Sequence, residues 1–156
     1  VYCKDADRRA TYANERFDFL GYTFRPRLSR SKFGKFFANF LPAVSNDAVK
    51  VMSREVWSWR INCRSDKSLG DLAHMVNKVV QGWINYYGRF YKSRLYPLFQ
   101  RINEYLVRWA KRKYKRLRGH TRQAKRWLVR VARREPKLFA HWRLGVRPEG
   151  WTMGAV

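Results

Sequence analysis

Residues 105–134 read YLVRWAKRKYKRLRGHTRQAKRWLVRVARR and contain thirteen Lys or Arg residues but no Asp or Glu. Apolar residues recur at helical spacing through the same stretch, first at Leu106 and Ala110 and later at Leu128 and Ala132. A disordered basic tail lacks such a pattern because it buries no core. The stretch therefore predicts helices with one apolar face and one cationic face.

Most of the positive charge lies in the second half of the chain. The 156 residues carry a formal net charge of +24. The part up to Lys78 has 15 basic and 8 acidic residues, whereas the part from Val79 has 20 and 3. A folded body with this charge repels itself unless a polyanion neutralises it. The expected partner is nucleic acid, and charge alone does not distinguish RNA from DNA.

Other classes of protein fit the sequence less well. Cys3 and Cys63 show no CxxC spacing and have no neighbouring His, so neither a zinc site nor a disulfide framework is predicted. No apolar run approaches the roughly 20 residues that cross a bilayer. Binding to a membrane surface is a distant alternative, because mutual packing accounts for the apolar stripes. The cysteine usage makes a reducing compartment the default expectation. The chain starts without Met, which suggests a piece of a longer polypeptide.

The N-terminal part predicts a β-hairpin. Residues 17–24 (FDFLGYTF) and 36–41 (FFANFL) are dense in aromatic residues, which favour strands. The alternation changes register near Gly21, and a bulge is the simplest account of this change. Pro42 is expected to end the second strand. The strands are expected to be joined by a loop with five basic residues, Arg25, Arg27, Arg30, Lys32 and Lys35.

Amphipathic helices are predicted after the hairpin. The first takes its N-cap from Ser45 or Asp47 and reaches about Ile61. The second starts at a capping box of Ser68 and Asp71, in which Asp replaces the usual Glu.

Two further helices follow Gly88. The third carries an apolar stripe and reaches about Leu117, and Gly119 is a natural stop. The fourth has Thr121 as a possible N-cap and ends at Pro136. The apolar stripe of the third helix consists of Leu95, Phe99, Ile102, Leu106 and Ala110.

The predicted fold class is therefore mainly α, with a small N-terminal β-hairpin followed by a bundle of about four helices. Residues 1–43 are assigned to the strands and hairpin, 44–135 to the helical bundle, and 136–156 to an irregular Trp-containing tail. Three aromatic residues of this tail are candidates to pack back on the bundle, namely Phe139, Trp142 and Trp151.

No catalytic constellation is found. Sites with two metal ions need converging carboxylates, whereas the eleven acidic residues are scattered and only Asp5 and Asp7 lie close together. His74, His120 and His141 lack metal-ligand spacing, and we interpret His74 as a structural residue near a buried stripe. The predictions are no catalytic residue, no metal, no cofactor and no small-molecule substrate for this chain.

The basic helices supply the candidate binding residues. Solvated helix faces normally mix charges so that i,i+4 ion pairs form, and a thirty-residue stretch without an acid cannot do so. Guanidinium groups suit bidentate contacts with phosphate. Tyr114 is the candidate for stacking on a base, although helical spacing favours core packing for most neighbouring aromatic residues. The predicted contacts with nucleic acid are Arg108, Lys111, Arg112, Lys115, Arg116, Arg118, Arg122, Lys125, Arg126, Arg130, Arg133 and Arg134.

Two segments resemble one family. Residues 17–27 read FDFLGYTFRPR, and residues 82–88 read GWINYYG ahead of the basic helix. Together they resemble the carboxy-terminal part of a bacterial group II intron reverse transcriptase, also called an intron-encoded maturase. The matching part is the end of the palm, the thumb and the maturase-specific X domain. The opening residues 1–5 (VYCKD) resemble the stretch shortly after the catalytic palm strands of that family.

The resemblance implies a site and a function. It places Phe19, Leu20, Gly21 and Tyr22 at the palm–thumb junction near the primer. The helices would grip the primer–template duplex and bind intron RNA so that it folds for splicing. The Tyr-x-Asp-Asp motif and the HNH endonuclease domain of the family do not occur here. The fragment is therefore expected not to polymerise DNA alone. Polymerase activity and Mg²⁺ would belong to the upstream fingers and palm of a cytoplasmic bacterial parent protein.

Two alternatives stay open. The chain could be the thumb of a CRISPR-associated or other group II-like reverse transcriptase that has lost splicing. It could instead be a free-standing basic RNA-binding module. The charge pattern supports polyanion binding in each case, and only the resemblance indicates intron RNA.

Overall fold

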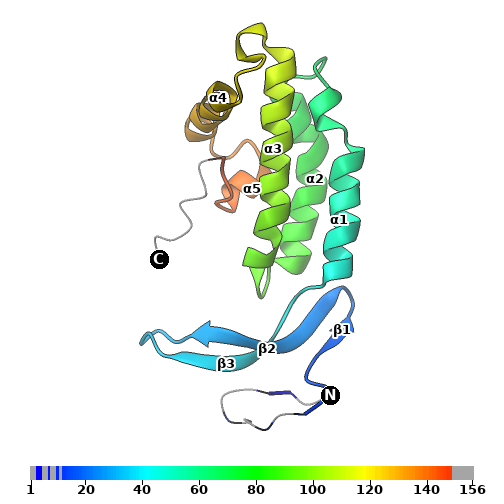
Figure 1. Cartoon of the computed structure of the whole chain (residues 1–156), viewed down its shortest axis with the longest axis vertical. Coiled ribbons are helices and arrows are strands. Elements are labelled where there is room, and N and C mark those ends of the chain that lie inside the picture. The colour runs from blue at the N-terminus through cyan, green and yellow to red at the C-terminus, as the bar shows by residue number, and fades with distance from the viewer. Residues whose placement is uncertain (1–2, 5–6, 8–9, 11, 149–156) are drawn as a thin grey trace.

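The computed structural model describes residues 3–148, apart from 5, 6, 8, 9 and 11. A three-stranded antiparallel sheet lies at one end, and a bundle of helices stands on it (Figure 1). This arrangement confirms the predicted fold class, mainly α with an N-terminal hairpin. None of the described helices is both long enough and apolar enough to cross a membrane.

The sheet has the strand order β1 (Phe17–Phe19), β2 (Tyr22–Arg30) and β3 (Phe36–Val44). The β2–β3 hairpin confirms the predicted one, but its loop is shorter than expected. The strand β3 also continues past Pro42, so the predicted end is wrong. An edge strand tolerates proline because one side of its backbone forms no ladder bonds. Three residues assigned to the loop lie within β2, namely Arg25, Arg27 and Arg30.

A two-residue turn joins β1 to β2, and the predicted bulge is wrong. Phe19 pairs with Tyr22 across this turn, and Leu20 and Gly21 have φ angles of 49° and 79°. Positive φ at both central residues is typical of the tight turns that match the twist of antiparallel strands. A Cβ atom on Gly21 would lie 2.7 Å from the hydroxyl oxygen of Tyr87.

Helix α1 (Asn46–Ser58) begins where predicted and ends early. The hydroxyl of Ser45 accepts a hydrogen bond from the N–H of Ala48 at 3.1 Å, which identifies Ser45 as the N-cap. The helix stops short of the predicted Ile61 because Arg60 is left-handed, with φ of 51°. A separate 3₁₀ helix, η1 (Ile61–Cys63), follows.

Helix α2 (Leu69–Tyr87) starts at the predicted capping box. The N–H of Ser68 donates to the Asp71 carboxylate at 2.9 Å, and the N–H of Asp71 donates to the Ser68 hydroxyl at 3.1 Å. Hydrogen bonding to the Asp71 carboxylate, first from the backbone N–H of Ser68 and then from the Ser68 side chain, lowers the pKa of the Asp71 carboxyl. The prediction of this helix start is confirmed.

Helix α3 runs along the long axis of the bundle, and α4 lies across it (Figure 1). Helix α3 (Tyr96–Lys113) follows the 3₁₀ helix η2 (Lys92–Leu95) and leads into the 3₁₀ helix η3 (Lys115–Leu117). Helix α4 (Thr121–Arg134) follows. Its predicted N-cap, Thr121, is instead the first helical residue, and its hydroxyl accepts a hydrogen bond from Nζ of Lys111 at 2.7 Å. The predicted apolar stripe of α3 is fully buried and so confirmed.

The segment after α4 packs into the bundle. It contains the short helix α5 (Ala140–Arg143), and Phe139 and Trp142 are fully buried. The side chain of Asn77 on α2 donates to the carbonyl of Leu138 at 2.8 Å and accepts from the N–H of Ala140 at 2.9 Å. The expectation of an irregular segment therefore fails over this turn of helix, and the expectation of back-packing is confirmed for both aromatic residues.

Trp151 lies outside the described residues. The predicted division of the chain into residues 1–43, 44–135 and 136–156 stays a prediction.

A buried polar cluster fixes α5 to α3. The Oδ1 atom of Asn103 accepts from Nε1 of Trp142 at 2.8 Å and lies 2.7 Å from Nε2 of His141. The Nδ2 atom of Asn103 donates to the carbonyl of Val146 at 3.2 Å, so Oδ1 faces His141 and Nε2 carries the proton. Burial lowers the pKa of His141 from 6.5 to about 3. His141, and not the exposed His74, is the buried structural histidine.

We expect Gly21→Ala to destabilise the protein by about 1–2 kcal/mol, because an L-residue at this φ is strained. Gly82→Ala in α2 is the matched control, since a Cβ there meets no atom within 4 Å. Alanine in a helix interior stabilises by about 0.5–1 kcal/mol relative to glycine. Urea denaturation measures the free energy of unfolding of both variants. Equal changes in the two variants would contradict the assigned left-handed turn at Gly21.

We expect acid to destabilise the fold through His141. Because its pKa is lowered in the folded state, the unfolded chain binds an extra proton between about pH 6.5 and about pH 3. Stability from this group is complete above pH 6.5 and falls on acidification by about 1.4 kcal/mol per pH unit. His141→Phe flattens the slope of unfolding free energy between pH 6 and pH 5, and the exposed control His74→Phe keeps it. Equal slopes would overturn the assignment.

Candidate nucleic-acid interface

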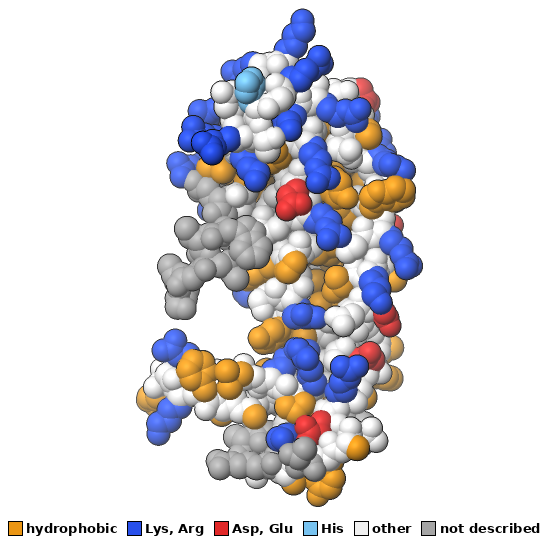
Figure 2. All heavy atoms as spheres, viewed as in Figure 1, with side chains coloured by type: hydrophobic (Ala, Val, Ile, Leu, Met, Phe, Trp, Pro, Cys, Tyr) orange, Lys and Arg blue, Asp and Glu red, His pale blue; other side chains and the backbone are white. Residues whose placement is uncertain are grey.

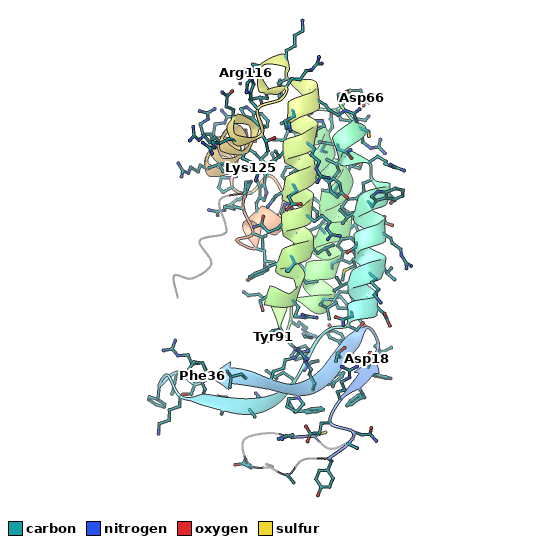
Figure 3. The ribbon with its side chains drawn as sticks, viewed as in Figure 1. Asp18, Phe36, Asp66, Tyr91, Arg116 and Lys125 are labelled. Carbon is teal, nitrogen blue, oxygen red and sulfur yellow. The ribbon has the colours of Figure 1, made fainter. Side chains whose placement is uncertain are left out.

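Basic side chains gather at the end of the bundle away from the sheet. Figure 2 shows Lys and Arg side chains clustered around α4 and the link that precedes it. Arg116 and Lys125, labelled in Figure 3, project from this end. The sequence predicted a cationic face on each of the two helices, and it did not predict where in the bundle these faces lie.

The amphipathic pattern of α4 orients its arginines. Ala124, Leu128, Val131 and Ala132 are buried against the bundle, so the opposite side of the helix faces solvent. Residues at three- and four-residue steps form one stripe on that side. A groove on this face is lined by Arg122, Lys125, Arg126, Val129, Arg130 and Arg133.

The link before α4 extends this stripe. Leu117 is buried and anchors η3. The neighbouring Arg116 lines the same groove as Arg126 and Arg130 of α4. A second groove is lined by Arg116, Leu117, Gln123, Arg126 and Arg130. We refer to five exposed residues as the η3–α4 surface, namely Arg116, Arg122, Lys125, Arg126 and Arg130.

The cations of the η3–α4 surface are not neutralised within the part of the chain that the structure describes. None of the five forms an ion pair with a described acidic residue. The neighbouring Arg134 does, with 3.7 Å between its Nε and Oε1 of Glu135. A group of uncompensated, solvent-exposed cations attracts a polyanion.

Three predicted residues of α3 lie at a larger cavity of about 720 Å³. Arg108, Lys111 and Arg112 line it together with Arg118 and residues of the η1 region, including Cys63. Some of these cations already have neutral partners. Nη1 of Arg112 lies 3.2 Å from the sulfur of Cys63. Nζ of Lys111 donates to the hydroxyl of Thr121 on α4. Arg112 and Lys111 are therefore held by contacts within the protein.

Lys113 has a structural role that the sequence did not reveal. Its Nζ donates to the carbonyls of Ser65 at 3.0 Å and Lys67 at 2.8 Å, and lies 5.6 Å from the ring centre of Trp109. These bonds tie the end of α3 to the loop before α2. Only the partners of a cation, and not its position in a basic stretch, distinguish such a residue from a binding residue.

Tyr114 is half-buried between two tryptophans. Its ring centre lies 5.9 Å from that of Trp109 and 5.2 Å from that of Trp127. The three rings join α3 to α4. The predicted stacking of Tyr114 on a base is therefore not supported by its position, whereas the core role of its neighbours is.

The predicted primer-proximal residues form the turn that docks the sheet on α2. The hydroxyl of Tyr22 donates to the carbonyl of Tyr86, and the hydroxyl of Tyr86 donates to the carbonyl of Leu20 at 3.0 Å. Phe19 and Leu20 are exposed, at 60% and 67%. Gly21 accepts a hydrogen bond from the N–H of the α1 N-cap residue at 2.7 Å.

The two segments with family resemblance thus meet in space. The ring centre of Tyr22 lies 5.4 Å from those of both Tyr86 and Tyr87. Burial, followed by the neighbouring tyrosines, raises the pKa of Tyr22. Proximity to a primer, and contact of the twelve basic residues with nucleic acid, stay predictions.

The described residues include no group of three or more His, Cys, Asp or Glu side chains that could hold a metal ion. Of the close acidic pair in the sequence, Asp5 lies outside the described residues.

One family comparison gives a match. The family model described as "Group II intron, maturase-specific domain" matches residues 49–128, which is just over half of the chain. The matched range runs from α1 into α4 and includes most of the η3–α4 surface. Searches of curated proteins and of solved structures found no significant match.

We expect Lys113 and Arg116 to respond differently to substitution. Lys113→Met removes two hydrogen bonds to carbonyls and destabilises the fold by about 1–2 kcal/mol. Arg116→Met alters an exposed residue and changes stability by less than about 0.5 kcal/mol. Urea denaturation tests the difference. Equal losses of stability would mean that Lys113 is not a structural tie.

Proposed function

The chain belongs to the family of the group II intron maturase-specific domain, and on this premise we propose that it binds structured intron RNA through the η3–α4 surface. The observation that carries the proposal is the exposure of five cations without a described acidic partner. Family membership supports group II intron RNA as the polyanion. Binding would assist the RNA to fold for splicing.

The geometry of α4 supports contacts with the phosphate backbone. Arg122, Arg126 and Arg130 recur at four-residue steps, so they lie about 6 Å apart along the helix axis. Such a row can contact successive phosphates of one strand without reading base edges. Each neutralised phosphate releases counterions, which makes the affinity strongly dependent on salt. Selection of intron RNA would then depend on its shape more than on its base sequence.

The proposal extends to the parent protein. We infer that the chain is the thumb and maturase region of a bacterial, cytoplasmic reverse transcriptase, and that the sheet faces its upstream fingers and palm. The exposed Phe19 and Leu20 support contact of this turn with another surface, including a primer–template duplex. RNA-directed DNA polymerisation and its Mg²⁺ would belong to those upstream parts, while this chain positions nucleic acid.

We expect Arg116→Gln, Arg126→Gln and Arg130→Gln together to weaken binding of structured intron RNA about 100-fold near 0.1 M salt, because three phosphate contacts are lost. The slope of log affinity against log salt falls by about 2–3. Filter binding at several salt concentrations measures both, and circular dichroism confirms that helix content is unchanged.

A matched control tests whether position or total charge matters. Arg54→Gln, Lys78→Gln and Arg89→Gln remove the same charge from exposed positions on α1, on α2 and after α2. This variant keeps most of its affinity and salt dependence if the η3–α4 surface binds RNA. If both triple variants lose affinity equally, binding depends on total charge and the proposed site is wrong.

A further inference from the structure

A second group of cations lies where the sheet meets the bundle, near Asp18 and Tyr91 in Figure 3. A pocket of about 250 Å³ opens there. It is lined by side chains that are distant in sequence, including those of β2, the start of α1 and η2. Its basic lining residues are Arg16, Arg25, Arg27, Lys50 and Arg94. None of them belongs to the predicted nucleic-acid contacts.

Arg27 lines this pocket and is only 8% exposed, whereas the other basic lining residues are exposed. Its Nε donates to the carbonyl of Leu41 at 3.1 Å, and its Nη2 donates to the carbonyl of Thr23 at 3.3 Å. The guanidinium carbon also lies 5.1 Å from the ring centre of Tyr91. All of these partners are neutral. They hold the guanidinium in place without balancing its charge.

Arg94 is positioned in a similar way, because its Nη2 donates to Oδ1 of Asn46 at 3.0 Å. The two carboxylates of the pocket have other partners. Asp18 accepts from the hydroxyl of Thr23, and Asp47 pairs with Lys50 at 3.3 Å. Among the described residues, no ion pair joins an acid to any of the three pocket arginines on β2 and η2.

The positive charges of the pocket arginines repel one another. Desolvation lowers the pKa of Arg27, and the charges of Arg25 and then Arg94 lower it further. An anion that reaches all three guanidinium groups would offset this repulsion. Guanidinium forks form parallel hydrogen bonds with tetrahedral oxyanions, and prior positioning of two of them reduces the entropy lost on binding.

We propose that Arg25, Arg27 and Arg94 form a phosphate-binding pocket. The phosphate group would come from a nucleic acid strand or from a free polyphosphate. Arg25 and Arg27 project from the opposite face of β2 to Tyr22, so the pocket is separate from the turn that docks on α2. It lies at the other end of α3 from the η3–α4 surface (Figure 1).

The test uses the full 156-residue chain with the three η3–α4 substitutions to Gln, so that phosphate binding at that surface does not obscure the result. Arg25→Gln and Arg94→Gln are added to remove two exposed members of the pocket, while the buried Arg27 is kept. The control instead adds Lys32→Gln and Lys35→Gln, which remove the same charge from the exposed β2–β3 loop.

The first arm titrates inorganic pyrophosphate and measures the rise in melting temperature against sodium chloride of equal ionic strength. The control chain is stabilised in a saturable manner. The chain lacking Arg25 and Arg94 binds about tenfold more weakly or not at all. Equal stabilisation of both chains, or none in either, overturns the pocket.

The second arm distinguishes the sources of phosphate. A short single-stranded oligoribonucleotide competes with pyrophosphate if the pocket accepts a strand phosphate, and fails to compete if it accepts free polyphosphate only. A 5′-phosphorylated and a 5′-hydroxyl form of the oligonucleotide separate terminal from internal phosphates. The interpretation that the pocket binds a nucleic acid strand rests on the proposed function, whereas the pyrophosphate experiment does not. Loss of RNA binding at the η3–α4 surface and loss of the pocket are therefore distinguishable.

Discussion

Packing of α4 on α3 is the interaction on which the basic surface depends. The arginines can lie together only if apolar contacts beneath them outweigh their repulsion. Burying a Leu side chain contributes about 1.5–3 kcal/mol, and Leu106 and Leu128 are both fully buried here. Two exposed like charges 4 Å apart repel by about 1 kcal/mol in water, and salt reduces this further. Burial of the core therefore outweighs the repulsion between the surface cations. Trp109, which is buried in this core, donates from Nε1 to the carbonyl of Arg64 at 2.8 Å.

Features that depend on local sequence were predictable. The capping box of α2 and the apolar stripe of α3 each lie within one helix, and both are confirmed. The β1–β2 turn was misread because a tight turn and a bulge change the strand alternation in the same way, and only pairing across Gly21 distinguishes them. The hydrogen bond of Asn77 reaches Leu138, 61 positions further along the chain, and that of Asn103 reaches Trp142, 39 positions further along. No periodicity in the sequence marks such long-range contacts.

The structure also separates cations by what they contact. Lys113 and Arg27 donate to backbone carbonyls and contribute to the fold, whereas Arg126 and Arg130 face solvent. Charge counts treat all of them alike, which is why the sequence predicted a basic surface but neither the tie at the end of α3 nor the pocket beside the sheet. Family membership gives the context of group II introns, and the contacts distinguish cations that hold the fold together from cations that face solvent.

Helix α3 has 18 residues between η2 and η3 and so is about 27 Å long. The hydroxyl of Tyr22 donates to the carbonyl of Tyr86, the hydroxyl of Tyr86 donates to the carbonyl of Leu20, and these two bonds hold the sheet against the end of α2. The two ends of the bundle therefore stand at a fixed separation, comparable to about eight base-pair steps of a duplex. If both proposed sites bind phosphate, the length of α3 sets a minimum size for their ligand: a rigid polyanion shorter than this span would occupy one site and could not bridge both.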